Sequence, residues 1–241
     1  MPTTLLISLI IVIAFGGEAL FGFGGGLVAV PLLSLFLDVH DAVVLVAIFQ
    51  FLLGFIVLRN FREVAWSLLP PLLVGMVLGV LIGVKILPIV SEQLLRVLLA
   101  AYILAFLVKT KLAPELAVTR ASWTGGIFSG VVSGFLQGCL GIGGPAMVIY
   151  LKGILSNARV FRASVIFCLS IVNLMRIPLV GYAELLAPPI IRTALIALPA
   201  FLIAVFLGQR YHRRIPEQMY FRVIYTLLAV TAVSLIIRAV A

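Results

Sequence analysis

Eight long apolar stretches divide this chain of 241 residues. A helix needs about 20 apolar residues to cross the hydrocarbon core of a bilayer, and six of the stretches have roughly that length. They lie near residues 41–59, 64–86, 92–109, 161–183, 187–209 and 217–238. The chain is 64% hydrophobic and 10% charged, whereas soluble domains are about 45–50% apolar and about 25% charged. We therefore expect a single all-α domain, residues 1–241, that crosses a membrane several times.

The other two stretches, residues 3–37 and 121–151, are too long for one ordinary crossing. Each contains a glycine-rich interruption, which suits a backbone that leaves and re-enters the helical conformation. We expect the two helices to restart after Gly26 and after Pro145. Non-helical backbone is tolerated at membrane depth only where it faces protein or a water-filled cavity. The interruptions therefore predict a site inside the protein.

The two interrupted stretches also resemble each other. Residues 24–25 align with residues 143–144 at an offset of 119, and at the same offset Glu18 aligns with Gln137. A duplication of this length predicts two repeats, about 1–115 and about 119–241.

The distribution of Lys and Arg predicts how the repeats are oriented, because cytoplasmic loops carry an excess of basic residues. If every stretch crosses once, each side receives eight of them and no orientation is favoured. If the interrupted stretches are re-entrant hairpins, eleven lie on the cytoplasmic side: Arg59, Arg62, Lys109, Lys111, Arg120, Lys152, Arg159, Arg162, Arg210, Arg213 and Arg214. The other side receives five: Lys85, Arg96, Arg176, Arg192 and Arg238.

The second arrangement gives an inverted-topology repeat, in which each half is a glycine-broken re-entrant helical hairpin plus three transmembrane helices. The N-terminus is then outside the cell (inner or plasma) membrane. Inverted repeats with broken helices are common in secondary transporters, which bind substrate near the bilayer midplane. The first N–H groups of a helix lack intrahelical partners and carry the positive end of its dipole, so they attract anions. We expect the two restarted helices to meet there and bind an anion through Gly24, Gly25, Gly26, Gly143, Gly144 and Pro145.

Five polar side chains within the apolar stretches are further candidates, with Glu18 and Gln137 as candidates for coupling. Glu18 is the only carboxylate deep in such a stretch, where its cost makes it a functional candidate. It either couples transport to protons or braces the hairpin by hydrogen bonds, and the neutral Gln137 favours bracing slightly. Arg176 and Asn173 share a helix face and either bind a sulfonate or carboxylate, or the arginine snorkels to the interface. Gln50 either lines a polar cavity or links helices.

Two shorter patterns have mainly structural interpretations. Glycines recur every four residues in the segments 75–83 and 126–138, which predicts close helix packing. Arg96 lies about one turn from a predicted helix start, where snorkelling is the favoured interpretation.

The segment FGFGGGLVAVPLL, residues 21–33, and its partner GCLGIGGP, residues 138–145, resemble the paired glycine signatures of the TauE/SafE family of sulfite and organosulfonate exporters. The resemblance extends over essentially the whole chain. It implies transport of small anions, especially sulfur-containing or carboxylate anions, by export or uptake. Gly26 is matched by Pro145, so we expect the second hairpin to turn differently from the first.

We therefore expect a secondary transporter of small anions that works by alternating access. The sequence has no GxxxxGK[ST] motif, so a gradient is the expected energy source. A channel or an accessory membrane subunit remains an alternative. An integral-membrane enzyme is disfavoured, because the eight acidic residues and two histidines are dispersed.

No cofactor, metal or catalytic residue is expected. The net charge is +9, but the 17 Lys and Arg residues are scattered between apolar runs and form no basic patch, which argues against nucleic-acid binding. The expected partners are the small anion and the lipid bilayer, and a homo-oligomer is compatible with the sequence.

Overall fold

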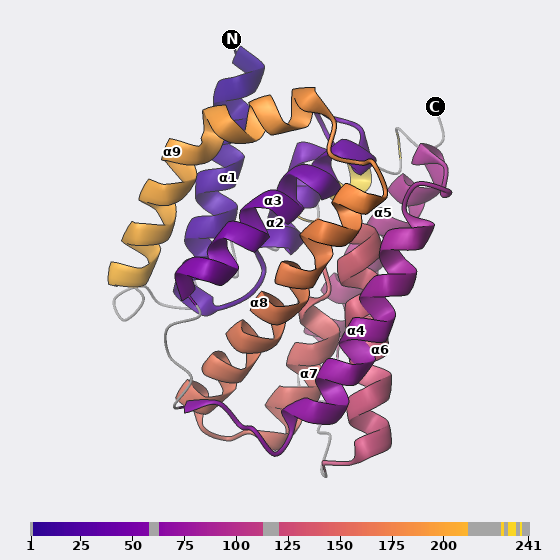
Figure 1. The fold of residues 1–241 in the computed structure, drawn as a ribbon, viewed down its shortest axis with the longest axis vertical. Coiled ribbons are helices and arrows are strands. Elements are labelled where there is room, and N and C mark those ends of the chain that lie inside the picture. Colours follow the sequence, from indigo (N-terminus) through magenta and orange to yellow (C-terminus); the bar gives the residue numbers. More distant parts are fainter. Residues whose placement is uncertain are drawn as a thin grey trace. The chain divides into compact units, whose positions relative to one another are not determined.

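The computed structural model describes residues 2–57, 63–112, 121–211, 228, 231–234 and 237. All regular elements in these ranges are helices, which confirms the all-α prediction (Figure 1). They are α1 Pro2–Phe21, α2 Gly25–Leu33, α3 Val39–Val57, α4 Leu69–Ile86, α5 Glu92–Leu112, α6 Trp123–Leu140, α7 Gly144–Ile154, α8 Ala158–Tyr182 and α9 Pro188–Tyr211. Most of the predicted span at 217–238 and several of the loop residues used to predict orientation lie outside the described residues.

Five of the described helices are long and apolar enough to cross a membrane: α1, α3, α4, α8 and α9. Four of them match predicted single crossings. The fifth, α1, has 20 residues and reaches that length by itself, whereas α2 has only 9. The helix lengths do not test whether the first stretch is a re-entrant hairpin, so that arrangement stays a prediction.

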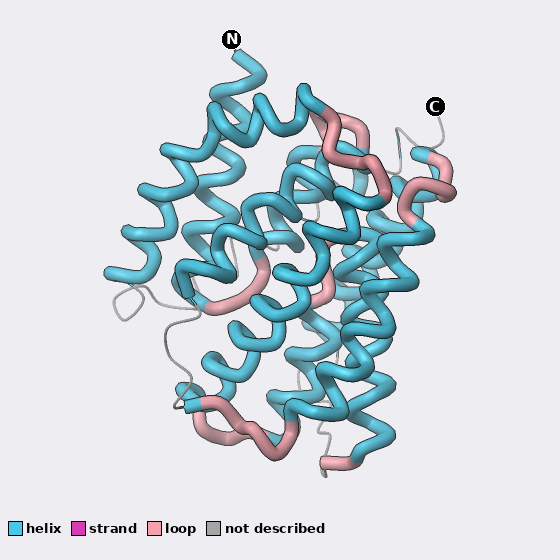
Figure 2. Tube along the Cα trace, in the orientation of Figure 1, coloured by secondary structure: helices cyan, strands magenta, loops and turns pink. Residues whose placement is uncertain are grey.

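Both predicted interruptions are present. The first lies between Phe21 and Gly25 and the second between Leu140 and Gly144 (Figure 2). Each helix restarts two residues earlier than we predicted. The reason for α7 is that proline fits the first turn of a helix, where its missing N–H would have no intrahelical partner. Pro145 therefore lies just inside α7 instead of preceding it.

The chain divides into two compact units, each described by itself here. Unit 1 contains residues 1–46, 90–114 and 187–241, and unit 2 contains residues 47–89 and 115–186. Neither unit coincides with a predicted repeat, and the duplication stays a prediction. In unit 1 the N-terminal helix α1 packs on α2 and α9, and in unit 2 α6 packs on α7 and α4.

In unit 2, α4 and α6 pack with their glycines facing each other, which confirms the predicted packing role of the two glycine series. A Cβ added to Gly138 would lie 2.8 Å from the carbonyl oxygen of Val80. A Cβ added to Gly83 would lie 2.9 Å from the backbone nitrogen of Cys139. Real Cβ atoms do not approach so closely, so the two backbones touch because neither carries a side chain there.

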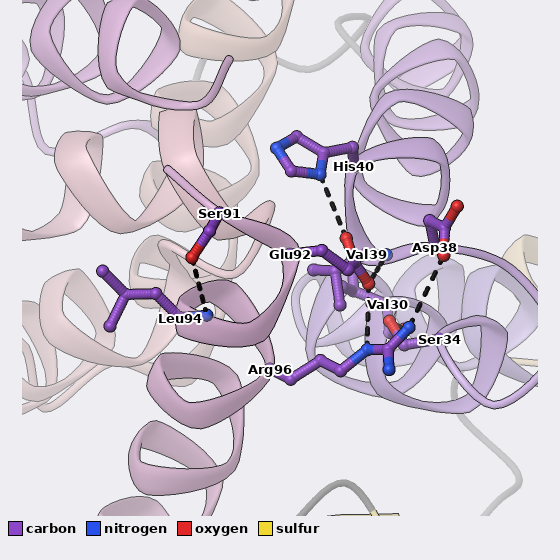
Figure 3. Close-up of polar contacts among 9 residues, drawn as sticks. All are labelled: Val30, Ser34, Asp38, Val39, His40, Ser91, Glu92, Leu94 and Arg96. Carbon is purple, nitrogen blue, oxygen red and sulfur yellow. Dashed lines mark hydrogen bonds and ion pairs between the residues drawn. The ribbon is translucent and has the colours of Figure 1, made fainter. Parts of the chain in front are cut away.

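In unit 1, the start of α5 is joined by charged side chains to the start of α3 and to Asp38 just before it (Figure 3). One oxygen of Glu92 accepts hydrogen bonds from the Val39 N–H, at 2.7 Å, and from Arg96 Nε, at 3.0 Å. Its other oxygen lies 3.0 Å from His40 Nδ1. Arg96 also lies 3.5 Å from a carboxylate oxygen of Asp38. Arg96 therefore has specific acidic partners, which snorkelling alone did not predict.

Candidate functional site

The backbone of the second interruption is held closely against α6. Gly141 ends α6 in the left-handed conformation, with φ 72°, and Gly143 precedes α7 with φ −70°. The Ser133 hydroxyl donates a hydrogen bond to the Gly143 carbonyl oxygen. A Cβ on Gly143 would collide with the Ser133 carbonyl oxygen and would lie 2.6 Å from Gln137 Cβ. Space, rather than backbone conformation, therefore requires glycine at position 143.

The Gln137 side chain is the centre of a buried hydrogen-bond network next to this interruption. Its oxygen accepts a hydrogen bond of 2.7 Å from the Gly143 N–H. Its nitrogen donates to Gln50 Oε1 at 2.9 Å and to Asn173 Oδ1 at 2.6 Å. Only 1% of Gln137 is exposed. One neutral amide therefore joins the start of α7 to α3 and α8.

The same network holds a buried guanidinium. Arg176 Nη1 donates to Gln50 Oε1 at 3.1 Å, and Gln50 Nε2 donates to the Gly141 carbonyl oxygen at 3.2 Å. Arg176 is 0% exposed, so its side chain does not reach the surface, and the snorkelling interpretation is wrong. Gln50, on α3, therefore links α8 to the second interruption. Linking helices was one of its two predicted roles.

The helical segments of unit 2 carry only positive charge. Their sequences contain no Asp or Glu, whereas Arg176 lies in the middle of α8. Buried charges are costly and mark binding sites or pathways when they occur within a membrane protein. The dipole of α7 adds positive potential at its first turn, beside Gly143. This region of unit 2 therefore favours an anion.

The first interruption, in unit 1, is built differently. Gly22 and Gly24 both have left-handed backbone, with φ 91° and 102°. The Gly25 N–H, in the first turn of α2, donates a hydrogen bond to the Glu18 carboxylate. Glu18 is 5% exposed. The predicted bracing role of Glu18 is therefore present, and this helix start already has an acidic side chain next to it.

The structure groups the predicted site residues into two sets. Gln50, Gln137, Asn173, Arg176 and Gly143 form one bonded cluster in unit 2, and Gly144 and Pro145 follow directly in the buried first turn of α7. Glu18, Gly24, Gly25 and Gly26 belong to unit 1. The predicted difference between the two turns is confirmed, because Gly24 is left-handed and its counterpart Gly143 is right-handed.

Two residues of the cluster were not predicted. Ser133 lies four residues before Gln137, so both side chains point from one face of α6. The four-residue spacing could have identified Ser133 as a neighbour of Gln137 from the sequence. Both residues lie within the glycine series 126–138, which was interpreted only as a packing surface. The Gly141 carbonyl contributes through its backbone, which no residue type reveals. Among the described residues, no group of three His, Cys, Asp or Glu side chains could hold a metal ion.

Comparison with known proteins gives one match. The family described as "Sulfite exporter TauE/SafE" matches residues 6–235, nearly the whole chain. No curated protein and no solved structure matches the chain.

Proposed function

The chain belongs to the TauE/SafE family, and on that premise we propose that it is a secondary transporter that carries sulfite, organosulfonates or related small anions across the cell membrane. The observation that carries this proposal is the buried link from Arg176 through Gln50 and Gln137 to the start of α7. It joins a guanidinium to a helix N-terminus through neutral amides alone. Both ends of that link attract negative charge.

The proposed substrate contacts follow from the chemistry of the groups. A guanidinium offers a planar fork of N–H donors that suits two oxygens of a sulfite or sulfonate group. The N–H groups of Gly144 and Ala146 belong to the first turn of α7, where no intrahelical acceptor exists. We assign substrate binding to these groups, with Asn173 and the amides of Gln50 and Gln137 fixing the position of Arg176.

The charge of the site supports a carrier mechanism. Neutral amides orient Arg176 without cancelling its charge, so the empty site is positive and the occupied site is close to neutral. Moving a positive site through a bilayer is costlier than moving a neutral one. Alternating access is then favoured when the anion is bound, and a gradient supplies the driving force.

The test compares two arginines on one helix. We expect Arg176→Gln to abolish the rise in melting temperature that sulfite causes in the wild-type protein, because a ligand that binds only the folded state stabilises it. Arg159→Gln is the matched control, since Arg159 is exposed on α8. The control should retain the full shift. Equal shifts in both variants would remove Arg176 from the binding site.

Transport itself is tested in proteoliposomes that contain only this chain. At zero membrane potential, unlabelled sulfite inside accelerates the uptake of labelled sulfite by a carrier, whereas it does not accelerate uptake through a channel. We expect saturable exchange in the wild-type protein and in Arg159→Gln, and none in Arg176→Gln. Flux that never saturates would favour the channel. Absence of any flux from the purified wild-type chain would favour an accessory subunit.

A further inference from the structure

The Glu18 carboxyl group has an incomplete set of hydrogen bonds. The carboxyl group accepts a hydrogen bond from the Gly25 N–H, while its Oε2 is buried and has no hydrogen-bond partner among the described residues. The carboxyl carbon would lie 3.0 Å from a Cβ added to Gly25, so the group lies directly against the first turn of α2. Glu18 is thus a buried acid at a helix N-terminus, with one oxygen satisfied and one not.

The helices around Glu18 carry few titratable groups that would hold it in one protonation state. The sequences of α1 and α2 contain no other titratable side chain. Of the helices that pack on α1, α9 contributes Arg192 and Arg210, which are exposed near its ends, and Tyr211 at its last residue. The ionised form is stabilised by the Gly25 N–H and the α2 dipole, and the neutral form by burial. Each form has a physical reason to be populated.

We propose that Glu18 is a proton-binding site and that proton exchange there couples anion movement to the pH gradient. The coupling part rests on the proposed transport function. The binding part does not, because it depends only on the buried carboxyl group in unit 1. The proton binds the carboxylate from one aqueous side and leaves to the other, so that no further reactant is needed.

Gln137 provides the natural control for this proposal. It occupies the aligned position before the second interruption and accepts a hydrogen bond from the Gly143 N–H at 2.7 Å. An amide can therefore support the start of a restarted helix, as a carboxyl group does in unit 1. Because glutamine has the shape of glutamic acid but no exchangeable acid proton, Glu18→Gln should fold and lose only the proton site.

The first experiment measures the proton directly. Infrared spectra of the wild-type protein in lipid, without any anion substrate, should contain a protonated carboxyl band that persists above the pH at which exposed carboxyl groups ionise. The band should disappear at higher pH and be missing from Glu18→Gln. A wild-type spectrum without such a titrating band overturns the proposal, whether or not the variant folds.

The second experiment measures coupling in proteoliposomes with labelled methanesulfonate, which stays ionised, so that any pH effect belongs to the protein. We expect Glu18→Gln to keep methanesulfonate exchange at equal pH and to lose the accumulation driven by a pH gradient. Glu18→Asp should restore part of that accumulation, since it restores an acid. Accumulation in Glu18→Gln equal to that of the wild-type protein overturns coupling at Glu18. A titrating band in a wild-type protein that exchanges neither methanesulfonate nor sulfite supports the proton site and contradicts the transport function.

Discussion

The two helix interruptions share a plan and differ in charge. In each, a side chain from the preceding helix accepts a hydrogen bond from the backbone at the restart, Glu18 in unit 1 and Gln137 in unit 2. The first interruption therefore has its own acidic group. The second has only amides around it, and a buried arginine is bonded to those amides.

The difference indicates that two similar backbone interruptions can present different chemistry. A helix N-terminus attracts negative charge wherever it occurs. Where the chain supplies an acidic group, as at Glu18, we expect an external anion to gain less, in keeping with the proposed proton site. Where the chain supplies Arg176 instead, attraction for an external anion increases. Two differences make the contrast: an acid or an amide at the aligned position, and the buried Arg176 bonded to the second network.

The largest expected effect on stability comes from Gly143→Ala. The new Cβ would collide with backbone of α6 and with Gln137, so α7 must move away. Overpacking costs about 1–3 kcal/mol, and loss of the Gly143–Gln137 hydrogen bond adds about 1 kcal/mol. Thermal unfolding in detergent should show a clearly lower Tm. The comparison is Gly25→Ala, where the obstacle is the movable end of Glu18. A loss in Gly25→Ala as large as in Gly143→Ala would contradict the difference between the two interruptions.

The next effect is on anion affinity. Gln137→Glu places an acid at the second interruption, as in the first, and an ionised carboxylate cannot donate to Gln50 and Asn173. We expect sulfite binding, measured by titration calorimetry, to weaken at least about tenfold, or about 1.4 kcal/mol. Glu18→Gln makes the reverse change in unit 1 and should leave sulfite affinity unaltered. If both variants weaken binding equally, the anion site cannot be assigned to unit 2.

The sequence predicted the backbone plan better than the side-chain partners. Glycine clusters inside apolar stretches locate both interruptions, because the conformational freedom of glycine is a property of the residue itself and does not depend on distant contacts. The mismatch of Gly26 with Pro145 also anticipated that the two turns differ. The hub role of Gln137 was not predicted, since its partner Gln50 is 87 residues away. The snorkelling alternative for Arg176 remained open for a similar reason: periodicity gives the depth of a residue but not the groups around it.

A smaller effect on stability is expected at Gly24, where backbone strain can be separated from steric overlap. Gly24 has φ 102° and a Cβ there would meet nothing within 4 Å, so Gly24→Ala tests backbone strain alone. We expect a loss of stability of about 1 kcal/mol. Gly16→Ala is the control, because its Cβ would make an ordinary 3.7 Å contact with Ala204 inside a helix. The control should leave the Tm unchanged or raise it slightly. A neutral Gly24→Ala would show that the left-handed turn relaxes without cost.

The smallest effect is expected where the polar contacts are accessible to solvent. Arg96 pairs with Glu92 and Asp38; the Asp38 side chain is 69% exposed, and the Arg96 and Glu92 side chains are 23% and 27% exposed. Exposed ion pairs contribute about 0.2–1 kcal/mol and weaken with salt. Arg96→Gln should therefore lower the Tm slightly at low ionic strength, and high salt should largely remove its difference from the wild-type protein. The same substitution at the buried Arg176 should alter sulfite binding at any ionic strength, because salt screens a buried charge far less. If high salt abolished sulfite binding while leaving the Arg96→Gln difference intact, the assignment of a buried charge to Arg176 and a partly exposed charge to Arg96 would be wrong.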